Sequence, residues 1–414
     1  MKMKLVSCLL FSSACLAFVL SVTTGARPGN RLHWVEQDHR NAAQRSNLKT
    51  ATVLIGVISL PGNPLVSSDI AWVDPGTKKF YLSDRSNFGI DIIDAESDLF
   101  VGRVTGFVGP IGLNGRGPNG LLVTPDKKAW AGDGNATVRV ADVNPNSPAY
   151  LHILKSISVA IPECGPNCNR ADEIGYDPAD DKILVAIDQP NSAANPTTPI
   201  APYAALIGAS SYQISQIIRV PNSVPGGGLE QPLWDPKIRR FFLTVPSVSV
   251  KDGKGEIAVI NPDDGIIEKT YSPGNCSPSG EVLTPSQRLV VECRGSVVIL
   301  NALNGEVIAT VPNVDADELW YNQGDGRVYA AVDDSGKLQV VDVENGTLLQ
   351  TLTDPGAFNE AAFAENNRIF TPVRVTASEV ATPRLDQTTC SLFGFRGTGC
   401  IAVFAHAGSD SNGR

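Results

Sequence analysis

The sequence predicts an all-β fold, a seven-bladed β-propeller, with a six-bladed ring as the alternative. Three observations lead to this prediction: a repeated unit of short strands, Gly/Asn/Asp turns between them, and one unpaired strand on the N-terminal side. In the best-defined copy, 315–352, four runs (ELWY, RVYAAV, LQVVDV and TLLQTL) are separated by GDG, DDSG and ENG. Short β-branched runs between such turns are typical of hairpins. One such sheet cannot bury both faces alone, so its repetition matters.

The composition and the N-terminus indicate a globular chain that enters the secretory pathway. Of 414 residues, 42% are hydrophobic and 19% are charged. Residues 1–26 contain two lysines, an apolar run and then small residues, which predicts a signal peptide cleaved after Ala26. The run is short and interrupted by serines, so a membrane anchor is the less favoured interpretation. We expect the mature protein in the secretory lumen or outside the cell, with no membrane contact beyond the leader.

The charge of the chain narrows the class of partner. The net charge is −9, and removal of the leader takes away two lysines and no acid. An acidic chain without a Lys/Arg cluster argues against nucleic acid and anionic membranes as partners. We therefore expect a small molecule as the binding partner.

The repeated unit begins after a polar stretch at 27–50 and a lone predicted strand at 51–60 (ATVLIGVISL). Each copy has an inner strand, a turn and a second strand. The seven copies start at SSDIAWVDPGTKKFYLSD, GPNGLLVTPDKKAWAGD, ADEIGYDPADDKILVAID, LEQPLWDPKIRRFFLTVP, PSGEVLTPSQRLVVEC, ADELWYNQGDGRVYAAVD and FNEAAFAENNRIFTPVR.

A third strand follows in every copy, as GIDIID, TVRVAD, AALIGA, EIAVIN, SVVILN, LQVVDV and CIAVFA. The seventh copy ends near His406 without a fourth strand, which 51–60 can supply. Pairing this strand into the last blade closes the ring and removes edges that would promote aggregation. We expect one domain over 51–408 and a flexible tail at 409–414. A pair of β-sandwiches would not explain seven aligned copies.

The start of each inner strand is polar, and these starts should meet at the mouth of the central channel. The first position in each blade is Asp69, Asn119, Asp172, Glu230, Ser279, Asp317 and Asn359. The next position is Ile70, Gly120, Glu173, Gln231, Gly280, Glu318 and Glu360.

Two interpretations of this polar ring are open. Water-filled channel mouths collect polar residues, and Asp and Asn also favour turns. Alternatively, clustered acids raise one another's pKa, so that one stays protonated and acts as an acid near neutral pH. On this second interpretation Asp69, Asp172, Glu173, Glu230, Asp317, Glu318 and Glu360 are candidate catalytic residues, and Asn119, Gln231 and Asn359 are candidate substrate-binding residues. Hard cations such as Ca²⁺ also prefer such oxygen ligands.

Cysteines and long loops point to the same face of the ring. Six cysteines remain after the leader, an even number that suggests three disulfides, with fifteen possible pairings. The spacing favours the local pairs Cys164–Cys168, Cys276–Cys293 and Cys390–Cys400. The longest insertions, 189–203, 246–255 and 375–399, follow second strands and should rim the channel mouth. The sequons at Asn135, Asn275 and Asn345 are glycosylation candidates.

Several kinds of site are disfavoured by what the sequence lacks. The only histidines are His33, His39, His152 and His406, and none falls at the inner-strand level, which disfavours a Ser-His-Asp hydrolase or a His-ligated metal. The sequence has no G-x-S-x-G, phosphate loop or dinucleotide fingerprint. The recurring aromatic residues Trp72, Trp234, Trp320, Tyr176 and Tyr321 are expected to pack between blades.

The repeat pattern, xxD-[IL]-x-[WY]-D-P-x₄-[FI]-[YL] followed by V-[IV]-D/N, resembles the superfamily that includes gluconolactonase-type lactonases and YVTN-type surface repeats. The resemblance covers nearly the whole mature chain and implies the fold rather than an activity. In the lactonase branch a Glu, two Asn and an Asp hold a divalent metal such as Ca²⁺ in the channel. Carried over, the Glu would be one of Glu173, Glu230, Glu318 and Glu360, the amides Asn119 and Asn359, and the Asp one of Asp69, Asp172 and Asp317.

In length, leader and blade style, the chain also looks like the fungal hetero-Diels–Alderases of tropolone–sesquiterpene pathways. That resemblance implies loss of water from a hydroxymethyl tropolone and addition of the resulting quinone methide across a humulene alkene. Acids in the mouth would assist dehydration, an apolar cavity would hold the two reactants together, and no metal or redox cofactor would be required. We thus expect a cyclisation catalyst of secondary metabolism, with a metal-dependent lactonase and a non-catalytic binding propeller as alternatives.

Overall fold

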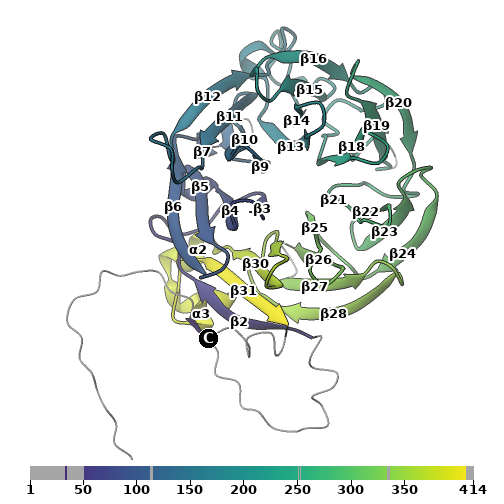
Figure 1. The fold of residues 1–414 in the computed structure, drawn as a ribbon. Coiled ribbons are helices and arrows are strands. Elements are labelled where there is room, and N and C mark those ends of the chain that lie inside the picture. The colour runs from purple at the N-terminus through teal and green to yellow at the C-terminus, as the bar shows by residue number, and fades with distance from the viewer. Residues whose placement is uncertain are drawn as a thin grey trace, which may run out of the picture.

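Seven β-sheets are arranged around a central axis, as the sequence predicts (Figure 1). This computed structural model describes residues 33–34, 51–111, 115–249, 251, 253–332 and 336–406. The predicted leader at 1–26, nearly all of the lead-in at 27–50 and the tail at 409–414 lie outside the described residues.

The first six blades are four-stranded antiparallel sheets whose strands run in chain order from the axis outwards. Blades one to three contain β3 (Ala71–Asp74), β4 (Lys79–Asp84), β5 (Gly89–Asp94), β6 (Leu99–Thr105); β9 (Leu121–Thr124), β10 (Lys128–Asp133), β11 (Thr137–Asp142), β12 (Ile153–Ser158); and β13 (Ala171–Asp177), β14 (Lys182–Ile187), β15 (Tyr203–Gly208), β16 (Ile214–Arg219). Blades four to six contain β17 (Pro232–Asp235), β18 (Arg240–Val245), β19 (Glu256–Asn261), β20 (Ile266–Tyr271); β21 (Glu281–Leu283), β22 (Arg288–Glu292), β23 (Ser296–Asn301), β24 (Val307–Pro312); and β25 (Leu319–Asn322), β26 (Arg327–Val332), β27 (Lys337–Asp342), β28 (Thr347–Thr353).

The seventh blade closes the ring with strands from both ends of the chain. It contains β29 (Ala361–Phe363), β30 (Arg368–Val373), β31 (Cys400–His406) and β2 (Thr52–Ile58), with β1 (His33–Trp34) paired outside β2. Strand β2 runs antiparallel to β31, with Thr52 opposite His406. The prediction that 51–60 completes the last blade is confirmed. The closure leaves no blade with an unpaired second or third strand among the described residues.

The burial pattern of the strands explains why the sequence specifies this arrangement. Middle strands are covered on both faces by neighbouring blades, so β4 and β14 are buried along almost their whole length. Outer strands face solvent on one side, and β28 alternates exposed and half-buried residues. The aromatic residues expected to pack between blades do so: Trp72, Tyr176, Trp234, Trp320 and Tyr321 are all partly buried against the interblade hydrophobic clusters.

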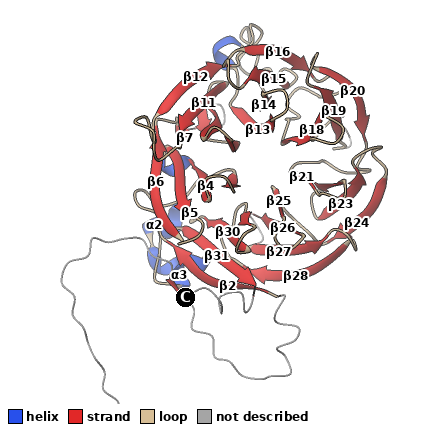
Figure 2. Cartoon of the chain, viewed as in Figure 1, coloured by secondary structure: helices blue, strands red, loops and turns tan. Residues whose placement is uncertain are grey.

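The short helices lie outside the ring of strands, beside the last blade (Figure 2). The segment between β30 and β31 contains α2 (Ala377–Ala381), η3 (Pro383–Leu385) and α3 (Thr389–Leu392). Thr376 and Glu379 form a reciprocal capping box at the start of α2. Two further single-turn helices are η1 (Arg85–Asn87), between β4 and β5, and η2 (Gly165–Asn167), before β13. Within the described part of the chain, no helix has the length and apolar character needed to cross a bilayer.

Three disulfides join the cysteine pairs that the spacing favoured, Cys164–Cys168, Cys276–Cys293 and Cys390–Cys400. Such bonds are compatible with an oxidising secretory compartment. The sequon residues Asn135, Asn275 and Asn345 are all exposed, as modification would require, and their glycosylation remains a prediction.

Candidate functional site

The channel mouth encloses a cavity of about 360 Å³, within the size range of small-molecule sites. Its lining contains five of the predicted acids but also four arginines that the sequence analysis did not anticipate. The lining residues are Asp69, Arg85, Arg116, Arg170, Asp172, Glu173, Glu230, Ala316, Asp317, Phe358 and Arg374. The mouth cavity is therefore lined by charges of both signs, whereas the sequence analysis named only carboxylates and amides there.

Arg85 is at the centre of a network of hydrogen bonds and ion pairs that joins the first three blades. Its guanidinium is ion-paired with Asp69, and its Nε and Nη2 donate to Asn119 Oδ1 at 3.1 and 2.6 Å. Asn119 Nδ2 in turn donates to the carbonyl oxygens of Arg116 and Ala171, both at 2.8 Å. Burial lowers the pKa of Arg85 to about 10, against the opposing charge of Asp69. The amide oxygen of Asn119, a predicted substrate ligand, is thus already occupied by Arg85.

Arg170 makes a second set of ion pairs on the opposite side of Asn119. Its Nη2 lies 2.6 Å from Asp172 Oδ2, and its Nη1 lies 3.1 Å from Asp188 Oδ2. Asp188 follows β14 and was not among the predicted residues. Burial raises the pKa of Asp188 to about 7, with the Arg170 charge opposing this and the Asp172 charge adding to it. Asp172 and Asp188 therefore share one guanidinium.

Glu173, from blade three, lines the mouth cavity, and its carboxyl group interacts with that of Glu318 from blade six. They are only 5% and 6% exposed. Burial is the main cause that raises the pKa of both carboxyl groups well above the ordinary value, and for Glu173 the charge of Glu318 adds to it. Burial and the neighbouring Glu318 charge therefore both oppose ionisation of Glu173.

Glycines make room for this pair. A Cβ on Gly120 would lie 2.3 Å from the Cα of Glu173, and one on Gly280 would lie 2.6 Å from the Cα of Glu318. The latter would also lie 2.8 Å from Glu318 Oε2. The neighbouring inner strands therefore approach closely because both positions lack a side chain. The two glycines of the predicted ring serve to position the carboxyl pair.

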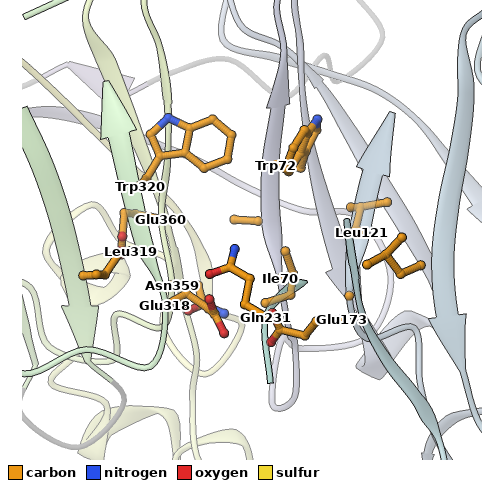
Figure 3. Close-up of a pocket in the computed structure, with 13 residues that line it drawn as sticks. Ile70, Trp72, Leu121, Glu173, Gln231, Glu318, Leu319, Trp320, Asn359 and Glu360 are labelled. Atoms are coloured by element: carbon orange, nitrogen blue, oxygen red, sulfur yellow. The ribbon is translucent and has the colours of Figure 1, made fainter. Parts of the chain in front are cut away.

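A second, smaller cavity of about 20 Å³ lies on the inner side of the pair, room for about one water. Figure 3 shows Glu173, Gln231 and Glu318 on one side and the indoles of Trp72 and Trp320 on the other. The two rings meet edge to face with centroids 5.4 Å apart. Gln231 Oε1 accepts from the backbone N–H of Glu281 at 2.7 Å, so this predicted substrate ligand is also held by the protein.

The seventh blade is offset by one residue from the predicted alignment. The N–H of Phe358, not of Asn359, bonds Pro372 O at 2.8 Å, in the way that Asp69 N–H bonds Ser83 O at 2.9 Å in blade one. Phe358 consequently lines the mouth cavity, whereas Asn359 and Glu360 line the smaller cavity. The expectation that Asn359 lies at the mouth is wrong.

Asn359 and Glu360, which line the smaller cavity, are nearly inaccessible to solvent. Asn359 is 1% exposed and neither its amide oxygen nor its amide nitrogen has a hydrogen-bond partner among the described residues. Burial raises the pKa of Glu360 well above its ordinary value, opposed by the backbone amide groups of Ala331 and Trp320.

The remaining predicted acids lie on the wall of the mouth cavity. Glu230 is half-buried; burial raises the pKa of its carboxyl, and the charges of Asp172 and Asp188 add to this. Asp317 is exposed to the mouth. Ser279, by contrast, is not part of the lining and donates to Glu292 Oε2 at 2.7 Å. No described residue of the loops 189–203, 246–255 and 375–399 lines either cavity, and their position around the channel mouth stays a prediction.

The donor set does not fit the metal site of the lactonase resemblance. Among the described residues, no three His, Cys, Asp or Glu side chains are grouped closely enough to hold a metal ion. Asn119 Oδ1 accepts from a guanidinium, and Arg85 and Arg170 place positive charge where a cation would enter. We therefore assign no reaction step to a divalent metal.

The arginines could have been found from their positions relative to the repeat. Arg85 and Arg374 directly follow the second strands of blades one and seven, and Arg116 and Arg170 shortly precede the inner strands of blades two and three. Those are the two loops that open on the mouth.

Comparison with known proteins identifies the architecture. No family model and no curated protein matches the chain. Among solved structures, one from a crystal structure of the mitotic checkpoint complex matches with a TM-score of 0.55 at 10% identity, over 89% of this chain and 97% of that chain. The WD40 β-propeller domain of Doa1 matches with a TM-score of 0.53 at 13% identity, over 87% of this chain and 98% of that domain. At such low identity the likeness concerns the fold alone, which is that of a β-propeller.

Proposed function

We propose that the protein is an enzyme of the secretory pathway that uses a protonated carboxyl group to catalyse acid-assisted chemistry on a small organic molecule. The observation that carries the proposal is the Glu173–Glu318 pair at the base of the mouth cavity. A carboxylic acid that is neutral at physiological pH can donate a proton to a leaving oxygen. The arginines above it can hold and orient a polar substrate.

The reaction that fits this arrangement best is loss of water from a substrate hydroxyl. The acid donates its proton to the departing oxygen while the carbon–oxygen bond breaks, and water leaves. The substrate then loses a proton of its own, which returns to the carboxylate and restores the acid. No electrons are gained or lost by the protein, so no redox partner is needed.

The finer form of the proposal follows the resemblance to the fungal hetero-Diels–Alderases. Water loss from a hydroxymethyl tropolone gives a quinone methide, whose addition to a humulene alkene forms one carbon–carbon and one carbon–oxygen bond. The Glu173–Glu318 pair would supply the acid for dehydration. The mouth cavity offers only Phe358 and Ala316 as uncharged lining among the described residues. The alkene partner would pack at the Ala316 side of this wall, because the Arg374 guanidinium lies 3.5 Å from the Phe358 ring centroid, and the polar tropolone would face the other arginines.

The lactonase alternative is disfavoured by the guanidinium that occupies Asn119, whereas a non-catalytic binding propeller uses the same cavity and differs only in turnover. The predicted leader and the three disulfides support a secretory location, where the sequons at Asn135, Asn275 and Asn345 would be glycosylated.

The test is an assay of the purified mature protein with a hydroxymethyl tropolone and humulene, with and without EDTA. Glu173→Gln and Glu318→Gln remove the proton donor, and Glu306→Gln alters an exposed glutamate as the matched control. We expect cyclised product that persists in EDTA, falls about 10²- to 10⁴-fold in each site variant and is unchanged in the control.

Three outcomes would contradict the proposal. Loss of activity in EDTA would favour the lactonase type of chemistry. Full activity in both glutamine variants would remove the acid role. Binding of the tropolone without any product would favour a non-catalytic propeller.

A further inference from the structure

Arg116 reaches the mouth cavity on a structural addition to blade two. The hairpin of β7 (Gly109–Ile111) and β8 (Gly115–Gly117) lies between β6 and β9, and no other blade has such a hairpin among its described strands. Two contacts fix its base: Asn119 Nδ2 donates to Arg116 O at 2.8 Å, and the N–H of Val108 donates to Asp133 Oδ1 at 3.2 Å. The described strand β8 thus carries Arg116 to the lining of the mouth cavity.

The guanidinium of Arg116 lacks the partners that two other arginines of the cavity have. Arg85 and Arg170 are each ion-paired with carboxylates. Arg116 is in no ion pair with any residue that the structure describes, and its Nε is buried without a hydrogen-bond partner. A half-buried cation without a partner is costly to the folded protein, which favours a functional reason for it.

The carboxyl groups that line the cavity also fail to explain the Arg116 guanidinium as a structural ion pair. Four guanidinium groups face five carboxyl groups. Burial raises the pKa of two of these carboxyls, those of Glu173 and Glu230, well above the ordinary value. Of the other lining carboxylates, Asp69 is ion-paired with Arg85 and Asp172 with Arg170, so neither of these two is ion-paired with Arg116.

We propose that Arg116 binds a planar, carboxylate-type anionic group of the substrate inside the mouth cavity. The chemical class includes carboxylates and their conjugated equivalents, in which two adjacent oxygens share one negative charge. Such a group matches the fork of parallel N–H donors that a guanidinium presents. This inference rests on the proposed function only in calling the bound molecule a substrate; the binding itself does not require turnover.

The test measures binding of benzoate, a planar carboxylate, to the purified mature protein by titration calorimetry. Benzamide has the same shape without the charge, and inorganic phosphate is an anion with tetrahedral geometry. We expect benzoate to bind more tightly than either. Arg116→Gln should weaken benzoate binding about 10- to 100-fold, the range for loss of a charged hydrogen-bonding partner.

Two further variants keep the result interpretable. Arg294→Gln changes an exposed arginine outside the cavity and should leave benzoate affinity within about twofold. Arg116→Lys keeps the charge but removes the fork, and should bind benzoate with intermediate affinity. Thermal unfolding of each variant establishes that it is folded, and Arg116→Lys serves as the test if Arg116→Gln does not fold.

The inference is overturned if benzoate does not bind the wild-type protein, if Arg116→Gln binds it normally, or if benzamide or phosphate binds as well. Failure of the proposed function gives a different pattern. The variants Glu173→Gln and Glu318→Gln should still bind benzoate, because neither changes Arg116. If these variants also show normal turnover, the acid role is wrong. That result would not contradict the anion site.

Discussion

Arg85 Nη2 lies 2.6 Å from Asn119 Oδ1, so a guanidinium of the first blade is bonded directly to the inner strand of the second. Because Asn119 also donates to Arg116 O and Ala171 O, one fully buried amide connects three blades at the channel mouth. The same side chain was predicted to bind substrate. Its hydrogen bonds to Arg85, Arg116 and Ala171 use the amide within the protein.

Asn119→Ala removes all of these hydrogen bonds and leaves the Arg85 guanidinium partly unsatisfied. Hydrogen bonds to charged groups contribute about 1.5–3 kcal/mol, so we expect the free energy of unfolding to fall by about 3 kcal/mol. Urea denaturation measures the change. The control Asn146→Ala changes an exposed asparagine outside the predicted sequons and should cost about 0.5 kcal/mol or less. Equal costs for the two variants would contradict a special role for Asn119.

The Glu173–Glu318 pair should make stability depend on pH in a particular direction. The pKa of both carboxyls is raised in the folded protein, mainly by burial. The folded state therefore holds protons that the unfolded chain releases above its ordinary Glu pKa of about 4.3. Stability is greatest below that value and falls as pH rises through the raised pKa values.

Replacing both residues by glutamine removes these titrating groups. Urea midpoints measured from about pH 5 to about pH 9 should fall less steeply in the double variant than in the wild type. Glu306→Gln, at an exposed position, should follow the wild-type curve. Parallel curves for the wild type and the double variant would show that the pair is ionised in the folded state.

The fold was predictable because its signals are local and repeated. Each blade has its own turn residues and alternating strands, and the unpaired strand at 51–60 predicts the closure. The ring acids were predictable for the same reason, since the start of an inner strand lies at a fixed distance from the turn that ends it. Asp69 and Glu230 could be identified by counting residues back from the turn alone.

The rest of the site depends on contacts between distant parts of the chain. Arg85 and Arg374 come together only when blades one and seven meet at the closure. The contact between Glu173 and Glu318 crosses the channel and depends on its width, which no local pattern encodes. Asn359 adopts a positive φ of 61°, and the hydrogen bond from Phe358 N–H to Pro372 O sets a register one residue away from the predicted alignment.

Asp354 connects the last blade to its helical insertion and gives a second pH prediction. Its carboxylate accepts from Thr371 Oγ1 at 2.6 Å and from Thr389 Oγ1 at 2.5 Å, and it is fully buried. Burial raises its pKa from 3.8 to about 6, with both hydroxyls opposing the change.

Stability should therefore fall by about 3 kcal/mol as pH rises from about 4 to above about 6, because a tenfold difference in proton affinity between the folded and unfolded states corresponds to about 1.36 kcal/mol. Asp354→Asn should remove this component, which urea unfolding between about pH 4 and about pH 7 can measure. A wild-type protein that gains stability over this interval, while Asp354→Asn does not, would mean that the carboxylate is favoured in the folded state and the predicted sign is wrong.

The three disulfides should differ in their contribution to stability according to the length of chain they close. Cys276–Cys293 spans 17 residues, whereas Cys164–Cys168 spans four. In the chain-entropy account, a cross-link stabilises by restricting the unfolded state, and the effect grows with the logarithm of the loop length. Replacing both cysteines of the longer loop by alanine should cost about 1 kcal/mol more than the same change in the shorter loop. Urea unfolding of the two double variants under non-reducing conditions measures the difference. A larger cost for the 164/168 pair would show that native-state packing around η2, rather than the restricted unfolded chain, determines what that bond contributes.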